Sequence, residues 1–277
     1  MSIPSIYDLA EGLWPDVPAT VYHQRVLGLA SKGALDRVSQ SPAHYLAWVN
    51  GADEEEPSSA LAFGTAFHAA MLEPERWETQ FVVQPDFGDC RFKDAKANRD
   101  AWRKEHEGAI IIEPAEMAAI RGMREAIHRH PLASEMLRDG SPELTLKWTD
   151  EETGLVCKAR ADFHLPRVGL CVDIKTTEDA SEGAFRRTVQ RWGYHRQAAF
   201  YSDGFRACGA PLRAFAFLVI ERRPPYAIGL YSLDLASEGN GRGTIRRDLD
   251  TLADCIERDD WPGYDESIRT IALPDWA

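Results

Sequence analysis

The chain has 277 residues, 44% of them hydrophobic, which is enough for one large domain or two small ones with a packed core. Its net charge of −12 argues at first against a polyanionic partner, because phosphate binding depends on lysine and arginine. The five cysteines are odd in number, scattered and never in a C-x-x-C pair, which argues against a disulfide framework, a zinc site and an iron–sulfur cluster; they are Cys90, Cys157, Cys171, Cys208 and Cys255.

The sequence contains no predicted membrane span and no predicted export signal. The N-terminus lacks a basic segment followed by an apolar run, and the longest apolar stretch, Ala214 to Ile220, is far too short to cross a bilayer. We therefore expect a cytoplasmic protein that makes no contact with a membrane.

The first half of the chain is predicted to be mainly helical. Up to about Asn50 the pattern is helical with irregular connections, and one helix begins at Ser41, which can cap a helix with proline at its first position. A later helix, from Ala60 to Leu72, is apolar on almost every side, so we expect it to be buried around His68. An exposed helix, a short strand and an amphipathic helix are expected next, over Lys93–Glu107, Ala109–Ile112 and Pro114–His128.

The second half of the chain alternates strands with helices. The expected strands cover residues 144–148, 155–163, 168–176, 214–221 and 226–233, and the expected helices cover 181–206 and 244–258. This order predicts an α/β (α+β) fold in which a mixed central sheet is flanked by helices. We expect a single domain over residues 1–277, with a helical N-terminal part (1–140) that carries His68 and a sheet core (141–277).

The residues with the clearest chemistry lie on a predicted hairpin. If the turn around Pro166 to Gly169 closes an antiparallel pair, Asp162 lies opposite Asp173 with Cβ atoms about 5 Å apart. Asp173 and Lys175 project to one side of their strand, because side chains alternate along it. Two carboxylates can hold Mg²⁺, and an ammonium group can orient a water molecule. The pattern suggests metal-assisted hydrolysis of a phosphodiester, although a solvated hairpin face also produces alternating Asp and Lys.

A cluster of basic residues follows the hairpin. A local basic stripe on an acidic body can still bind the backbone of a nucleic acid. A solvated helix face is the alternative interpretation of the same residues. The cluster consists of Arg186, Arg187, Arg191, His195 and Arg196.

The hairpin residues resemble the signature of the PD-(D/E)XK nuclease superfamily, which places two acids and a lysine on a β-hairpin. The RecB-like branch of this superfamily adds a histidine in a buried upstream helix and a Q-x-x-x-Y pair on the helix after the lysine strand. The matching residues occur here in the expected order as His68, Asp162, Asp173, Lys175, Gln197 and Tyr201.

Within that branch the sequence is similar to the RecE-type exonuclease (exonuclease VIII) family of phages and prophages. The resemblance implies an exonuclease dependent on Mg²⁺, or on Mn²⁺ in its place, that digests the 5′-ended strand of linear double-stranded DNA. The 3′ single strands left behind would serve DNA recombination through a single-strand annealing protein of the RecT type, and a ring-shaped homo-oligomer is implied as well. The similar segments are residues 22–23, 31–32, 41–45, 64–74, 154–177, 197–201 and 261–264.

The same resemblance implies roles for individual residues. The implied ligands of one or two metal ions are His68, Asp162, Asp173 and the carbonyl group of Ile174. Lys175 would position the water that attacks the phosphate.

Other residues would act around this centre. Gln197 and Tyr201, four residues apart and therefore on one helix face, would contact DNA near the scissile phosphate. The basic cluster, and not the resemblance, predicts contacts to the DNA backbone from Arg186, Arg187, Arg191 and Arg196. Glu143 opens the first strand of the sheet core and is a further acid that could join the site.

Three other functions stay open at the level of the sequence. An endonuclease or restriction-type enzyme on the same core is disfavoured by the absence of an appended recognition domain. A four-cysteine nuclease of the CRISPR-associated kind would have clustered cysteines, which this chain lacks. A catalytically silent DNA-binding or assembly subunit would have lost acids that are intact here.

Overall fold

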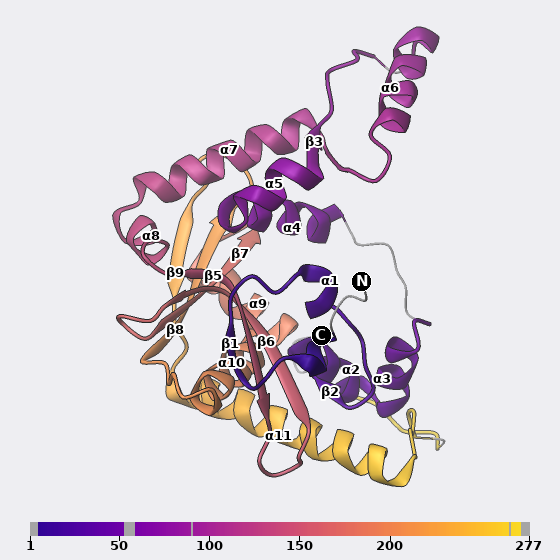
Figure 1. Ribbon diagram of the computed structural model, residues 1–277, viewed down its shortest axis with the longest axis vertical. Coiled ribbons are helices and arrows are strands. Elements are labelled where there is room, and N and C mark those ends of the chain that lie inside the picture. Colours follow the sequence, from indigo (N-terminus) through magenta and orange to yellow (C-terminus); the bar gives the residue numbers. More distant parts are fainter. Residues whose placement is uncertain (1–4, 53–58, 90, 266, 273–277) are drawn as a thin grey trace.

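The computed structural model describes residues 5–52, 59–89, 91–265 and 267–272. Within these ranges seven strands form one mixed sheet with helices on both faces (Figure 1), which confirms the predicted fold class. β7 and β8 are parallel, as are β2 and β6, and the other neighbouring strands are antiparallel. The strand order is β1 (Gly12–Trp14), β5 (Ser141–Thr149), β6 (Val156–Leu165), β7 (Leu170–Thr177), β8 (Ala214–Glu221) and β9 (Ile228–Tyr231), with β2 (Leu29–Ala30) added to β6.

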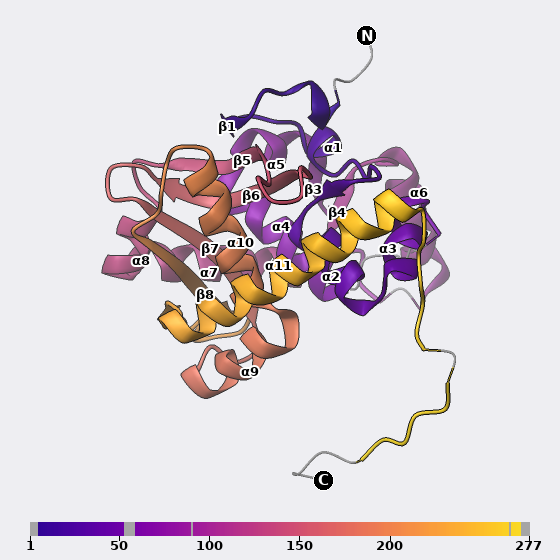
Figure 2. The same cartoon turned by 90° about the horizontal axis from the view of Figure 1, so that it is seen from below.

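The two faces of the sheet have separate hydrophobic cores. Side chains of Cys171 and Phe217 pack into one core, whereas the neighbouring Val172 and Leu218 pack into the other, as strand alternation requires. The helices of the first core are α2 (Lys32–Gln40), α3 (Pro42–Val49), α9 (Glu182–Trp192), α10 (Tyr194–Ala207) and α11 (Leu235–Arg258), and Figure 2 shows α11 running beside α10. The helices of the second core are α4 (Ser59–Leu72), α5 (Pro74–Gln80), α7 (Pro114–Arg129) and α8 (Pro131–Met136).

The N-terminal part is less purely helical than predicted. β1 pairs with β5 and β2 pairs with β6, so the first 30 residues extend the sheet assigned to residues 141–277. Two short elements, η1 (Ile6–Asp8) and α1 (Ala19–Tyr22), accompany them. β3 (Phe81–Val83) and β4 (Ile110–Ile112) form a second, two-stranded sheet. The segment that connects these two strands contains α6 (Lys93–Glu105), which projects from the rest of the molecule (Figure 1).

The predicted single helix over residues 181–206 is wrong. Gly193 has φ of +63°, a left-handed conformation that ends α9, and α10 begins at the next residue. Arg186 and Arg191 therefore lie on a different helix from Gln197.

The last helix begins nine residues earlier than predicted, at Leu235, with Asp234 as its cap. Gly241, in the part of the helix that was not predicted, is needed for packing. A Cβ atom at Gly241 would lie 2.3 Å from the carbonyl oxygen of His195, so only glycine allows α11 to approach α10 this closely. No helix in the described ranges has the length and apolar character needed to span a membrane.

Candidate active site

The predicted hairpin is present, and its strands separate at the candidate site. The turn closes with the backbone N–H groups of Val168 and Gly169 donating to the Leu165 carbonyl, and the ladder ends at the pair Phe163 and Val172. Beyond that pair, Asp162 Oδ2 accepts a hydrogen bond of 2.7 Å from the backbone N–H of Ile174. The carboxylate of Asp162 thus occupies the place of a ladder partner.

The backbone is irregular at two acidic residues on neighbouring strands. On β6, Ala161 packs into the first core but Phe163 packs into the second, so the strand changes face at Asp162. On β5, Glu143 has φ of +47°, a left-handed conformation that is rare for a residue with a side chain. Such strain, of order 1–3 kcal/mol, tends to occur at functional sites. Both irregularities lie where the two carboxylates meet.

His68 faces this point from α4, on the side of the second core. Its Nε2 atom lies 3.0 Å from the Ile174 carbonyl oxygen, and its Nδ1 atom lies 3.6 Å from Asp162 Oδ2. A neutral imidazole donates only one hydrogen, so one of these contacts needs a second proton or a cation. Ligand atoms of His68, Glu143 and Asp162 all lie within 4.8 Å of one another. One nitrogen and two carboxylates at this spacing fit a divalent cation.

Asp173 and Lys175 form a buried ion pair beside this cluster. The side chain of Asp173 is 1% exposed, and its Oδ2 atom lies 2.5 Å from Lys175 Nζ. Gln197 Nε2, from α10, donates to Oδ1 of the same carboxylate. Despite its proximity to Lys175, Oδ2 accepts no hydrogen bond of good geometry, which leaves a lone pair for another partner. The Lys175 ammonium also lies 4.6 Å from the centre of the Tyr194 ring.

The acids of the site differ from those that the hairpin geometry predicts. Asp162 and His68 are joined by Glu143, which the sequence suggested only as an additional acid, whereas the Asp173 carboxylate is turned towards Lys175 and Gln197. The Ile174 main chain joins the first group, since its N–H contacts Asp162 and its carbonyl contacts His68.

Burial and charge shift the proton affinities of these groups. Burial raises the pKa of Glu143 to about 8, and the negative charge of Asp162 adds to this effect. Burial also raises the pKa of Asp173 to about 6, although Lys175 opposes the shift. Burial alone would lower the pKa of Lys175, but the two neighbouring aspartates outweigh it and raise that pKa. Lys175 is therefore suited to act as a cation rather than as a base.

Without a divalent cation, the protein should lose stability as the pH rises from about 5 to about 8. The pKa values of Glu143 and Asp173 are higher in the folded chain than in the unfolded one, so their contribution is fully present below the unfolded values. It is lost as the pH rises through the folded values, by up to roughly 1.4 kcal/mol for each pH unit that separates the folded from the unfolded pKa. Chemical denaturation in chelator at several pH values measures this. Glu143→Gln should make the unfolding free energy depend less on pH. An unchanged slope of unfolding free energy against pH would contradict the raised pKa of Glu143.

The polar residues predicted to contact DNA from α10 are buried. Gln197 is 9% exposed and holds Asp173, and Tyr201 is 8% exposed and hydrogen-bonds to Tyr22. Arg196 is also 9% exposed and is paired with Asp248 at 2.5 Å and with Asp36 at 3.3 Å. The phosphate contact predicted for Arg196 is thus replaced by a link between α2, α10 and α11. The arginines that remain exposed are Arg186, Arg187 and Arg191 on α9.

Removing the Gln197 amide should lower the stability of the protein. Gln197→Leu leaves a buried carboxylate oxygen of Asp173 without its donor, which should cost about 1–3 kcal/mol of folding free energy. Urea denaturation measures this cost, with the exposed Gln80→Leu as the matched control. Equal stability of the two variants would mean that the contact to Asp173 contributes nothing.

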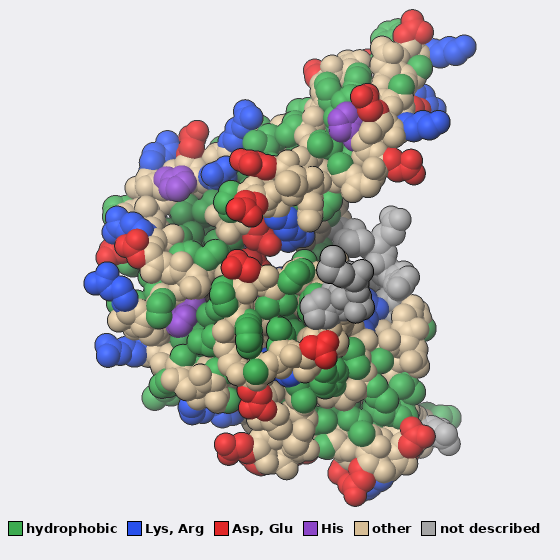
Figure 3. All heavy atoms as spheres, viewed as in Figure 1, with side chains coloured by type: hydrophobic (Ala, Val, Ile, Leu, Met, Phe, Trp, Pro, Cys, Tyr) green, Lys and Arg blue, Asp and Glu red, His purple; other side chains and the backbone are tan. Residues whose placement is uncertain are grey.

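Sequence reasoning did not predict Arg160 and Tyr22 near the acids. The guanidinium of Arg160 lies 4.3 Å from the centre of the Tyr22 ring and donates to the Val17 carbonyl at 2.6 Å. Its positive charge opposes the raised pKa of Glu143. The available signal was the spacing, because Arg160 precedes Asp162 by two residues on the same strand. Figure 3 shows the surrounding face hollowed below α5, where acidic and basic side chains gather.

Comparisons with known proteins give the family and the fold of the chain. The chain is similar in fold to a candidate exonuclease of Eubacterium rectale, with a TM-score of 0.63, 14% identity, and coverage of 94% of this chain and 96% of that one. A phage-related exonuclease of Haemophilus somnus matches with a TM-score of 0.34 and 11% identity over 61% of this chain and 85% of that one, too weakly to add support. No curated protein matches the sequence significantly. The model of the PDDEXK-like domain of unknown function (DUF3799) matches residues 31–274, and the chain therefore belongs to this family.

Proposed function

We propose that the protein is a divalent-metal-dependent DNA nuclease that acts as an exonuclease on linear double-stranded DNA. The observation that carries the proposal is the convergence of His68, Glu143 and Asp162 within 4.8 Å, next to the buried pair of Asp173 and Lys175. A histidine, three acids and a lysine at one point have no structural need for one another, since burying charge is unfavourable. Membership of a PDDEXK-like family supports hydrolysis of a phosphodiester.

The side chains of the site would divide the chemistry among them. His68, Glu143 and Asp162 would hold the cation, and Asp173, on the neighbouring strand, would hold Lys175 in place beside them. A bound Mg²⁺ would polarise the phosphate and neutralise charge that develops on its oxygens. Lys175, held as an ammonium by Asp173, would orient the attacking water.

The choice of exonuclease over endonuclease rests on resemblance to the RecE-type family and on the fold shared with a candidate exonuclease. The same resemblance supports digestion of the 5′-ended strand, a partner of the RecT type and a ring-shaped oligomer. We therefore include the polarity, the partner and the oligomer in the proposal.

Comparison of linear and covalently closed circular DNA tests the proposal. The wild-type protein with Mg²⁺ should degrade linear duplex and spare the closed circle of the same sequence. Cleavage of both at equal rates would identify an endonuclease on the same core. Degradation of neither would favour a silent binding subunit.

End-labelled duplexes test the direction of digestion. A 5′ label should be released as small products before a 3′ label on the same strand is lost. Earlier release of the 3′ label would contradict the proposed polarity while leaving the nuclease assignment intact.

A further inference from the structure

A groove with a positive lining begins beside the reaction centre. It lies between α2 and the junction of α9 with α10 and has a volume of about 760 Å³. Among the described residues that line it, four are cationic and Asp36 is the single acid, in a chain whose net charge is −12. Asp36 contacts two of these cations, Lys32 at 2.6 Å and Arg196 at 3.3 Å, and Arg196 also pairs with Asp248, which does not line the groove. The other two cations are Arg37 and Arg191.

An exposed aromatic ring stands at the edge of this groove. Trp192, the last residue of α9, is 55% exposed, and the Arg191 guanidinium lies 5.0 Å from the centre of its ring. Its backbone is fixed, because Lys32 Nζ donates to the Trp192 carbonyl at 2.8 Å and Gly193 ends the helix in a left-handed conformation. The ring is thus held in place without being covered.

Tyr194 lies between the groove and Lys175. Tyr194 lines the groove, and the Tyr194 ring is the one that contacts the Lys175 ammonium at 4.6 Å. Burial lowers the pKa of Lys32, the neighbouring Asp36 opposes this shift, and the like charges of Lys175 and Arg196 add smaller contributions in the direction of burial. The positive potential of the groove therefore extends to the reacting group.

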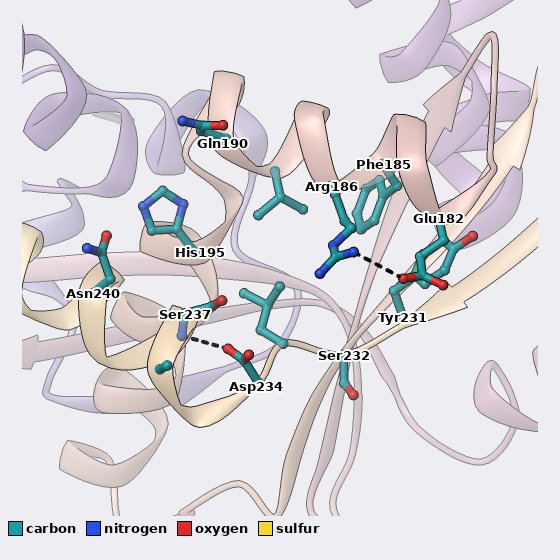
Figure 4. A pocket seen from close by; sticks show the side chains of 13 residues that line it. Glu182, Phe185, Arg186, Gln190, His195, Tyr231, Ser232, Asp234, Ser237 and Asn240 are labelled. Carbon is teal, nitrogen blue, oxygen red and sulfur yellow. Dashed lines mark hydrogen bonds and ion pairs between the residues drawn. The ribbon is translucent and has the colours of Figure 1, made fainter. Parts of the chain in front are cut away.

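A neighbouring hollow lacks this character. It has a volume of about 650 Å³ and shares Gln190 and His195 with the groove, and these two side chains lie at one end of the view in Figure 4. At the other end Arg186 pairs with Glu182 at 3.6 Å. A second acid of its lining, Asp234, caps α11, so two acids face one arginine and this hollow has no excess of positive charge.

We propose that the groove binds unpaired nucleotides of the DNA strand, with a base stacked on Trp192 and phosphates near Arg191 and Lys32. This proposal rests on the proposed function and deepens it by naming the form of the substrate. Sites for single strands combine a positive groove with aromatic rings, because every base has a face that can stack. A paired duplex offers its backbone but keeps its bases stacked on one another, so Trp192 discriminates between the two forms.

Binding of a fluorescein-labelled dT 12-mer, measured by anisotropy in chelator so that no hydrolysis occurs, tests the groove. Trp192→Leu should weaken binding about tenfold, and Trp192→Phe should retain most of the affinity, because stacking is lost only in the first. The control is Phe92→Ala, which removes an exposed aromatic ring (69% exposed) beside α6. A blunt 12-base-pair duplex should bind wild type and Trp192→Leu about equally.

A second pair of variants tests the phosphate contact. Arg191→Ala should weaken binding of the dT 12-mer. It should also lower the slope of log affinity against log salt concentration by about 0.7 units. Arg129→Ala, in the last turn of α7 as Arg191 is in the last turn of α9, should leave both unchanged.

The outcomes separate the groove from the proposed function. If Trp192→Leu binds the 12-mer as wild type does, while wild type degrades linear DNA, the groove assignment is overturned and the nuclease proposal stands. An equal loss of affinity for single-stranded and duplex DNA in Trp192→Leu would also overturn the groove assignment, because the ring would then not distinguish unpaired bases from paired ones. A wild-type protein that neither binds nor cleaves DNA would overturn both.

Discussion

Replacing Lys175 with alanine should lower the rate of DNA hydrolysis by about a hundredfold or more, the scale for a group that acts in the transition state. The Lys175 ammonium is kept charged by Asp173 and contacts the ring of Tyr194, which lines the groove. Without it, the attacking water loses its cationic neighbour and Asp173 loses its buried counter-ion. Single-turnover hydrolysis of a linear duplex with Mg²⁺ measures the effect.

A matched control is available for this substitution. Lys147 is also a buried lysine on a sheet strand, 7% exposed, but its ammonium donates to the carbonyl of Tyr7 and to that of Leu9, away from the acids. Lys147→Ala should reduce stability without reducing the rate of the folded protein. Wild-type turnover in a folded Lys175→Ala protein would remove the proposed role of the lysine.

Removal of divalent metal should abolish activity altogether. In excess chelator the carboxylates of Glu143 and Asp162 face His68 with no cation between them, and the phosphate has no Lewis acid. Mg²⁺ or Mn²⁺ should restore turnover, whereas Ca²⁺ should bind without supporting it, because its looser coordination positions water poorly.

The metal prediction can be followed without an activity assay. Each cation should raise the melting temperature of the wild-type protein, and Asp162→Asn should remove most of that shift. Asp203→Asn, which changes an acid on α10 paired with Arg206 and Arg242, should keep it. Full activity in excess chelator would contradict the whole mechanism.

The hairpin and the shared side of Asp173 and Lys175 were predictable because they depend on local rules. Alternation along β7 places Asp173 and Lys175 on one side, and the turn before Gly169 closes the strands. The buried character of α4 follows from an apolar sequence on nearly every side, which also carries His68 inward.

The contribution of Glu143 was harder to predict, because it depends on backbone irregularity. In a regular ladder Glu143 would only be a carboxylate near a strand end. Its left-handed conformation and the change of face at Asp162 bring the two acids together, and no periodic pattern encodes either feature.

The partners of the residues on α10 could not be predicted for a related reason. A single helix over 181–206 would carry the arginines and Gln197 together. Gly193 instead divides this segment into α9 and α10, so the arginines of α9 and Gln197 lie on separate helices. Arg196 then faces Asp248 from α11, a helix that lies about 50 residues away in sequence. Long-range packing of this kind leaves no signal in local spacing.

Anomalous diffraction from crystals grown with Mn²⁺ tests the central claim most directly. A peak should lie between His68 Nδ1 and the carboxylates of Glu143 and Asp162, and it should disappear in Asp162→Asn. If a protein that hydrolyses DNA with Mn²⁺ shows no peak at this position, or keeps it in the variant, the reaction centre is not where these residues meet.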